Sequence, residues 1–152
     1  MDYKRIMALD PGTVRTGVAI SDPLNIIANP WGYLESSDRQ RFLDKVSELA
    51  RENSVSMIVV GLPMRMDGTK GTKAEESEAL AEELKELGFD VTLVDERLSS
   101  KEAEGLLIMA DVRRNKRKKA VDKVAAAVIL QKYLDTRKRE SGISDIIDTE
   151  GA

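Results

Sequence analysis

Four acidic residues occupy positions from which their carboxylates could meet in the folded chain: Asp10, the adjacent Asp95 and Glu96, and Asp122. Asp10 and the adjacent pair each end a short apolar run of the kind that forms a β-strand, and Asp122 lies early in an apolar helical segment. Oxygen donors from separated parts of a chain are the ligands that Mg²⁺ and Mn²⁺ prefer. Two such ions about 4 Å apart can activate a water and stabilise the leaving oxygen in phosphodiester hydrolysis. The acidic residues therefore predict a site for Mg²⁺ or Mn²⁺ that hydrolyses phosphodiester bonds.

Each acid also has a purely structural interpretation. Asp10 precedes a Pro-Gly pair, so its side chain could begin a turn by bonding to the nearby backbone. Asp122 could be an acid that the dipole favours at the start of a helix. Because successive side chains of a strand point to opposite faces, only one of Asp95 and Glu96 can share a face with Asp10. The alternation alone does not decide between the two.

The composition excludes several kinds of catalytic site and indicates the cellular compartment. The 152 residues contain no His and no Cys, which excludes His-based catalytic triads, His-ligated zinc and disulfides. No apolar run approaches the roughly 18 residues that a membrane-spanning helix needs, and the lack of Cys favours a reducing compartment. We expect a cytoplasmic protein without a membrane segment, present as a monomer or a weak homodimer.

The hydrophobic periodicity predicts an α/β protein with one domain at 1–138 and an acidic, disordered tail at 139–152. An antiparallel N-terminal hairpin should open a mixed sheet whose later strands are parallel and whose flanking helices form two further layers. We expect strands at 30–34, 55–60 and 89–95, helices at 38–53, 72–87, 99–110 and 120–137, and an irregular loop at 61–71. Asp38 should cap the first helix, and Thr72 with Glu75 should form a capping box for the second, whose apolar stripe ends at Leu87.

Parallel strands also determine where the acids should lie. Such strands point their carboxyl ends to the same edge of an open sheet, where binding sites usually form. Asp10, Gly61 and the acidic pair at 95–96 all come at strand ends, so we expect them to lie near one another.

A dense basic segment precedes Asp122. Six of the seven residues at 113–119 are cations: Arg113, Arg114, Lys116, Arg117, Lys118 and Lys119. A charged run is often a solvated surface, but beside carboxylates that cleave phosphodiesters it suits the backbone of a nucleic acid. Aromatic residues make up only 4% of the chain, so we expect recognition by shape and phosphates rather than by base stacking.

Four segments carry a resemblance to a known family: ALDPGTVRTGVAISDP at 8–23, VVGLPMRMDGTKG at 59–71, LVDERLSS at 93–100 and KRKKAVDKVAAAVILQKYL at 116–134. In this order they resemble the YqgF (RuvX) family, whose members are described as Holliday-junction-resolvase-like and as pre-16S rRNA nucleases. The resemblance implies a ribonuclease-H-like fold and divalent-metal-dependent cleavage of a phosphodiester bond. It maps an acidic triad onto Asp10, Glu96 and Asp122, with Glu96 rather than Asp95 as the second member.

The resemblance also implies roles for two arginines outside the basic segment, and a third arginine lies where this chain departs from the family. Arg15 and Arg97 match positions of the family for which contact with nucleic acid is the natural role. In the loop where the family tends to have Asn, this chain has Met64 and Arg65, and an Arg there could contact phosphate.

Our leading hypothesis is an endonuclease that depends on Mg²⁺ or Mn²⁺ and processes the 5′ end of precursor 16S rRNA in ribosome biogenesis. The alternatives are a Holliday-junction resolvase acting on branched DNA and a non-catalytic RNA-binding assembly factor. The turn sequence DPGT also resembles the first phosphate loop of sugar kinases and actin-like ATPases. Those proteins need two such domains, and 152 residues leave no room for a second.

Overall fold

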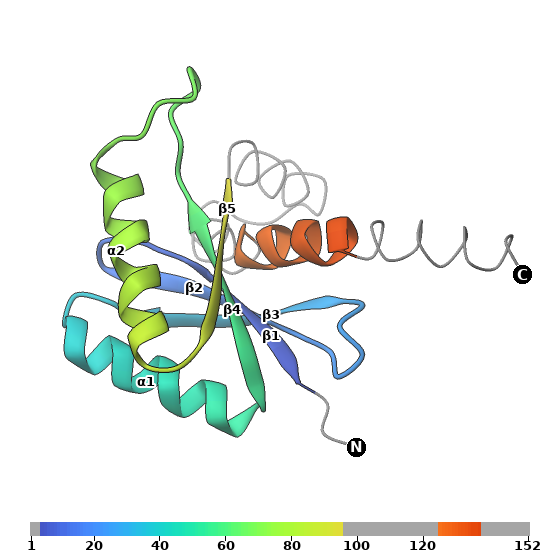
Figure 1. The fold of residues 1–152 in the computed structure, drawn as a ribbon. Helices are drawn as coiled ribbons and strands as arrows, with labels where there is room; N and C mark the ends of the chain where they lie inside the picture. The colour runs from blue at the N-terminus through green and yellow to red at the C-terminus, as the bar shows by residue number, and fades with distance from the viewer. Residues whose placement is uncertain (1–3, 96–124, 138–152) are drawn as a thin grey trace, which may run out of the picture.

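The computed structural model of the chain describes residues 4–95 and 125–137, drawn in colour in Figure 1. The elements follow in the order β1 (Arg5–Asp10), β2 (Arg15–Ser21), β3 (Ala28–Glu35), α1 (Arg39–Glu52), β4 (Val55–Leu62), α2 (Thr72–Glu86), β5 (Asp90–Asp95) and a helix at 125–137. The helix predicted at 99–110, the start of the last helix and the tail at 139–152 lie outside the described residues. Within the described ranges, no helix combines the length and the hydropathy needed to span a membrane.

The five strands form one mixed sheet in the order β3-β2-β1-β4-β5 (Figure 1). β1 is antiparallel to β2, and β2 to β3, whereas β1, β4 and β5 are parallel to one another. The three parallel strands therefore end on one side of the sheet, named here the carboxyl edge, and begin on the other, the amino edge. β3 is an outer strand, as predicted for a strand that contains Pro30, and it extends over Ala28–Glu35 rather than 30–34.

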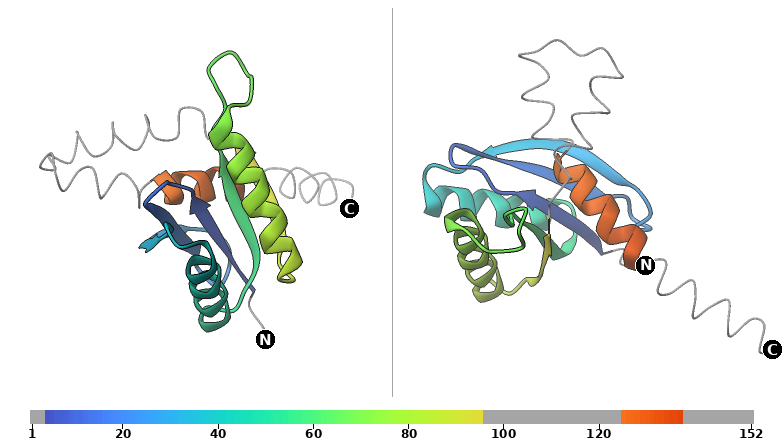
Figure 2. Two further views of the ribbon diagram at one scale, coloured as in Figure 1. Left: turned by 90° about the vertical axis from the view of Figure 1, so that its left-hand side faces the viewer. Right: turned by 90° about the horizontal axis from the view of Figure 1, so that it is seen from above.

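Helices cover both faces of the sheet and give the three layers that the sequence predicts (Figure 2). On one face, Phe42 of α1 and Leu80 of α2 pack in a cluster with Leu9 of β1. On the other face, Ile129 of the helix at 125–137 packs in a second cluster with Ile6. Full burial of such a side chain contributes about 1.5–3 kcal/mol. The two clusters therefore hold the three layers together.

Small residues lie where the last helix meets the sheet. Ala8 of β1, Ala19 of β2 and Ala126 of the helix are all fully buried in the second cluster. Without larger side chains between them, the helix and the two strands can approach closely, which suits the dense packing of a protein core. This close contact fixes the helix on the face of the sheet to which Ala8 belongs.

The starts of α1 and α2 differ in how they are capped. Asp38 caps α1 as predicted, because its carboxylate accepts a hydrogen bond from the Arg41 N–H at 3.2 Å. The capping box predicted for α2 is wrong, since Gly71 is the N-cap and no described side chain bonds to the first turn. The backbone of Gly71 is extended, with φ −111° and ψ −171°. The helix therefore begins directly after Gly71, and Thr72 lies inside its first turn.

The end of α2 departs from the predicted apolar stripe at Leu87. The other members of the stripe, Ala74, Ala81 and Leu84, are buried, whereas Leu87 is 51% exposed. Leu87 is the C-cap, and Gly88 follows it with a φ of 100°. The chain turns away from the helix at this point, so Leu87 no longer continues the buried face.

Candidate active site

Asp10 ends β1 at the carboxyl edge of the sheet. It pairs with Gly17 of β2, and Leu9 just before it pairs with Val60 of β4. Strand alternation places Asp10 on the same face as Ala8, which is the face that the helix at 125–137 covers. Asp10 is partly buried, so its carboxylate lies at the border of that face.

The turn between β1 and β2 fixes the backbone directly after Asp10. A Cβ atom on Gly12 would lie 2.2 Å from the carbonyl oxygen of Arg15, so any other residue there would force the backbone to move. The Ser36 hydroxyl donates to the Gly12 carbonyl oxygen at 2.8 Å, and the Ser36 N–H donates to the Val14 carbonyl oxygen at 2.9 Å. These bonds tie the turn to the chain after β3 and hold the end of β1 in place.

Asp95 ends β5, which lies two strands from β1 at the same carboxyl edge. Neighbouring strands are about 4.8 Å apart, so the ends of β1 and β5 are roughly 10 Å apart. Leu93 packs against the cluster under α1 and α2, whereas Val94 packs against the cluster under the last helix. Asp95 therefore belongs to the face opposite to that of Asp10. Glu96, the other member of the acidic pair, lies outside the described residues.

The last described helix brings a C-terminal part of the chain onto the face of Asp10. Ala126 and Ile129 are fully buried there, next to residues of β1. The Gln131 side chain bonds to the backbone at the start of β3 and in the loop before it, at 2.9 and 3.0 Å. Asp122, which the sequence places on the helix face of Ala126 and Ile129, lies outside the described residues.

The donor chemistry of the chain suits a hard metal ion. The sequence has no His or Cys, so carboxylates, hydroxyls and backbone carbonyls are its oxygen donors for Mg²⁺ or Mn²⁺. Among residues 4–95 and 125–137, no group of three metal-ligating side chains is present. Of the predicted triad, Asp10 lies in these ranges and Glu96 and Asp122 do not.

Two carboxylates away from Asp10 have lowered pKa values. A hydrogen bond from the backbone N–H of Ile27 is the largest cause that lowers the pKa of Asp22, in the loop between β2 and β3. The hydroxyl and the backbone N–H of Thr69 lower the pKa of Asp67, in the loop before α2. Both carboxylates accept hydrogen bonds from their own loops.

Two of the cations predicted to contact nucleic acid lie in the described part of the chain. The guanidinium carbon of Arg15 is 5.1 Å from the centre of the Tyr33 ring on β3, which is a cation–π distance. Arg65 is exposed in the loop between β4 and α2, and its guanidinium passes beside Gly71. The other predicted cations, Arg97 and those at 113–119, lie outside the described residues.

The loop between β4 and α2 is more regular than predicted. Met64 and Lys70 form an antiparallel bridge across it. Inside the bridge, the Asp67 carboxylate accepts hydrogen bonds from the N–H and the hydroxyl of Thr69 at 3.0 and 2.6 Å, and Gly68 has a φ of 86°. The predicted start of the loop at 61 is wrong because β4 continues to Leu62, and within the loop these local bonds and the glycine close a tight turn.

A cavity of about 350 Å³ beside the turn between β1 and β2 is absent from the predictions made from sequence. The turn, the segment before α1 and one face of α2 line it, and Ser77 is among the lining residues. The sequence does contain one sign of this cavity. Ser77 interrupts the apolar stripe of α2. A hydroxyl at such a buried position needs a hydrogen-bond partner.

The arrangement of strands and helices is that of known junction-resolving enzymes. The structure of T. thermophilus RuvC in complex with a Holliday junction substrate matches with a TM-score of 0.52 and 15% identity, over 88% of this chain and 95% of that chain. Fowlpox virus resolvase, solved with substrate Holliday junction DNA, matches with a TM-score of 0.54 and 14% identity, over 87% and 97%. These likenesses show the ribonuclease-H-like fold that the sequence motifs imply.

The sequence itself shows the family. Residues 4–136 match the model of a family described as "RuvX: Holliday junction resolvase". Relatives from Bacillus cytotoxicus and Bacillus thuringiensis, each named "Putative pre-16S rRNA nuclease", are 48% identical over 136 residues, which cover 88% of this chain and 99% of theirs. The chain therefore belongs to the RuvX family, and the resemblance seen in its motifs is confirmed.

Proposed function

We propose that this chain is a divalent-metal-dependent endonuclease that hydrolyses phosphodiester bonds in structured nucleic acid. Its proposed substrate is precursor 16S rRNA, processed at the 5′ end during ribosome biogenesis in the cytoplasm. The observation that carries the proposal is the position of Asp10 in a RuvX-family chain, at the carboxyl edge and on the face that the last helix covers. The name of the 48% identical relatives supports the choice of substrate.

Asp10, Glu96 and Asp122 are the proposed ligands of Mg²⁺ or Mn²⁺. Asp95 belongs to the face opposite to Asp10, which favours Glu96 of the acidic pair. Ala126, four residues after Asp122 in the sequence, is buried on the face of Asp10, and the helical periodicity predicted for 120–137 would bring Asp122 to the same face, which favours Asp122 as the third acid. When bound, such an ion supplies Lewis-acid chemistry that activates water and stabilises the leaving oxygen.

Cationic side chains near the three acids are proposed to bind the phosphate backbone. Arg15 begins β2 at the carboxyl edge, and Arg65 is exposed in the loop after β4. Arg97 and the basic segment at 113–119 adjoin the other two acids in the sequence. Backbone contacts hold a strand without reading its bases. Selection of the cleavage position therefore depends on the shape of the RNA.

The acidic pair at the end of β5 gives the sharpest test of this function. D95N and E96Q each remove one negative charge from adjacent positions, so each variant is the control for the other. On a precursor 16S rRNA fragment with Mg²⁺ or Mn²⁺, we expect E96Q to cleave at least about a hundredfold more slowly, because a metal ligand contributes several kcal/mol to the transition state. D95N should stay within a few fold of the natural protein, and omission of metal should abolish cleavage. Full activity of E96Q, or an equal loss in both variants, would contradict the proposed triad.

A Holliday-junction resolvase is the second candidate, and the description of the matching family favours it. Resolution needs two symmetric cuts across a four-way DNA junction, so two copies of the chain must act together. Paired cuts in such a junction, made only with metal, would establish this activity. A monomer that leaves the junction intact and cuts precursor rRNA would exclude it. Tight RNA binding without cleavage of either substrate would instead identify a non-catalytic assembly factor.

A further inference from the structure

The cavity of about 350 Å³ directly borders the proposed catalytic edge. One wall is the turn that starts at Pro11, the residue after Asp10. The opposite wall is the first part of α2, where Lys73 and Ser77 lie one turn apart on the same helix face. The cavity lies on the face of α1 and α2, whereas Asp10 lies on the face of the last helix. A ligand in this cavity would therefore contact a nucleic-acid strand that crosses the carboxyl edge beside Asp10.

Ser77 has a buried hydroxyl that the fold itself does not explain. The residue is 1% exposed, and its Oγ has no hydrogen-bond partner in the described part of the chain. Buried polar groups nearly always have a partner, and a helical serine can bond to a carbonyl oxygen of the preceding turn. Ser77 makes no such bond, so a hydrogen-bonding group remains unused at the wall of the cavity.

The charges around the cavity favour an anion with a single negative charge. Lys73 forms no ion pair with any other described residue, and the Arg39 guanidinium contacts Glu83 through one nitrogen at 3.2 Å, which leaves other N–H donors. Glu76 also lines the cavity, so the charged lining residues, two cations and one carboxylate, sum to +1, of which the Glu83 carboxylate on Arg39 offsets a part. The N-cap Gly71 provides no side chain for the first turn of α2, which adds the positive end of the helix dipole.

We propose that this cavity is a subsite for one phosphodiester group of the nucleic-acid strand. The proposal rests on the proposed function, because it needs a strand that passes Asp10. The Lys73 ammonium would balance the charge of the diester, and the Ser77 hydroxyl would donate to one of its oxygens. A terminal phosphate carries up to two negative charges, and the Glu76 carboxylate would repel the second. The site therefore prefers the interior of a strand to free phosphate or a nucleotide.

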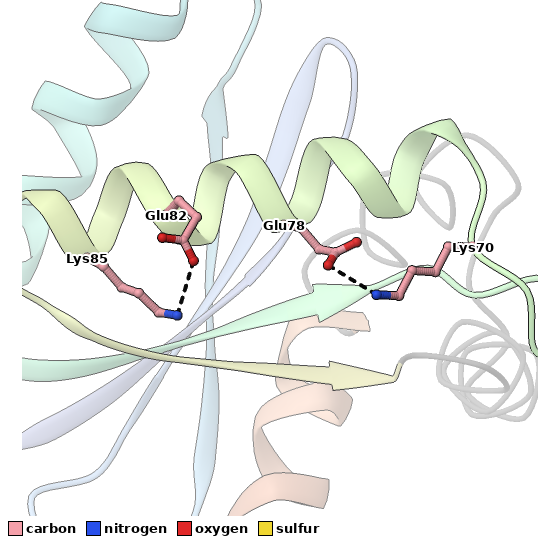
Figure 3. Close-up of polar contacts among 4 residues, drawn as sticks. All are labelled: Lys70, Glu78, Glu82 and Lys85. Carbon is pink, nitrogen blue, oxygen red and sulfur yellow. Dashed lines mark hydrogen bonds and ion pairs between the residues drawn. The ribbon is translucent and has the colours of Figure 1, made fainter.

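Binding of a precursor 16S rRNA fragment in the absence of divalent metal tests the subsite without cleavage. We expect K73Q to reduce the slope of log Kobs against log salt by about 0.7–0.9, as for the loss of one phosphate contact. S77A should weaken binding about tenfold without lowering the melting temperature. The matched control is K85Q, which removes the same charge from α2. Lys85 lies at the far end of that helix (Figure 3), and its ammonium is 3.3 Å from the Glu82 carboxylate. K85Q should leave the binding constant and the salt slope unchanged.

The outcomes separate the subsite from the proposed function. If the natural protein does not bind the RNA, the proposed function fails and the subsite fails with it. If it binds but K73Q and S77A bind equally well, the subsite alone is overturned. A higher melting temperature for S77A with unchanged affinity would show a purely structural serine and would also overturn it. Thermal stabilisation by inorganic phosphate, lost in both variants, would identify a site for free phosphate and overturn the assignment to a diester.

Discussion

Two serines in the described part of the chain are fully buried, Ser21 at the amino edge of the sheet and Ser77 on α2 beside the carboxyl edge, and they differ in their surroundings. Ser21, at the amino edge, accepts a hydrogen bond from the Ile6 N–H at 2.9 Å and donates to the Asn25 side-chain oxygen at 2.6 Å. Ser77, beside the carboxyl edge, is equally buried and has no partner among the described residues. At the amino edge the chain therefore satisfies its own hydroxyl, and beside the carboxyl edge one hydroxyl has no partner among the described residues.

The loops at the two edges differ in whether a cavity lies beside them. In the loop at the amino edge, Asp22 accepts hydrogen bonds from the N–H groups of Ile26 and Ile27 at 2.7 and 2.8 Å. The Asn25 side chain also donates to the Lys4 carbonyl oxygen at 3.0 Å, which closes the loop against the start of β1. The turn at the carboxyl edge is also held by hydrogen bonds, from Ser36, but it forms part of the wall of a cavity. Structural bonds therefore close the loops at both edges, and the cavity lies beside the carboxyl edge, where open α/β sheets usually have their sites.

Neutralising one carboxylate at each edge gives the largest expected difference. Asp10 and Asp22 each stand where a strand gives way to a loop, and D10N and D22N remove the same charge. With precursor rRNA and Mg²⁺ or Mn²⁺, we expect D10N to lower the cleavage rate by at least about a hundredfold through loss of a metal ligand. D22N should cleave at the natural rate, because all the hydrogen bonds that the Asp22 side chain makes to described residues lie within its own loop. Circular dichroism should show both variants folded, and a fully active D10N would remove Asp10 from the site.

The acids at the carboxyl edge could be predicted because strand patterns are local. An apolar run that ends in a carboxylate defines both the end of the strand and, through alternation, the face of each residue. That reasoning gives the correct strand ends for Asp10 and Asp95. It leaves the choice within the acidic pair open, because the faces of β5 become distinct only when Leu93 and Val94 pack against different helices.

The start of α2 and the cavity could not be predicted, because both depend on contacts between distant residues. Thr72 and Glu75 have the spacing of a capping box, but the chain enters the helix from the bridged loop through the extended backbone of Gly71. The cavity needs the turn after Asp10, the segment before α1 and α2 to come together. In the sequence, Ser77 is the one residue that indicates the cavity, because it interrupts the apolar stripe of α2.

The two buried serines should respond with opposite sign to the same substitution. S21A leaves the Ile6 N–H without its acceptor, so we expect a loss of about 1–3 kcal/mol in the free energy of unfolding. S77A removes a hydroxyl that has no partner in the fold, so we expect a gain of up to about 1 kcal/mol. Urea unfolding of the three proteins measures both differences. An equal loss in the two variants would mean that the Ser77 hydroxyl is satisfied in solution and that the contrast between the edges is false.

The smallest expected effect is a pH dependence of the melting temperature that arises from Asp22 at the amino edge. Backbone N–H groups, led by that of Ile27, hold the pKa of Asp22 below its ordinary value of about 4. A lowered pKa means that the unfolded chain binds the proton more readily, so Asp22 stabilises the fold above that ordinary value and stops doing so as the pH falls through its folded pKa. D22N lacks this contribution, so its melting temperature should lie below that of the natural protein at pH 7. The two melting temperatures should converge as the pH falls below about 4. A constant difference down to the most acidic pH at which both proteins fold would show that the charge of Asp22 does not stabilise the loop.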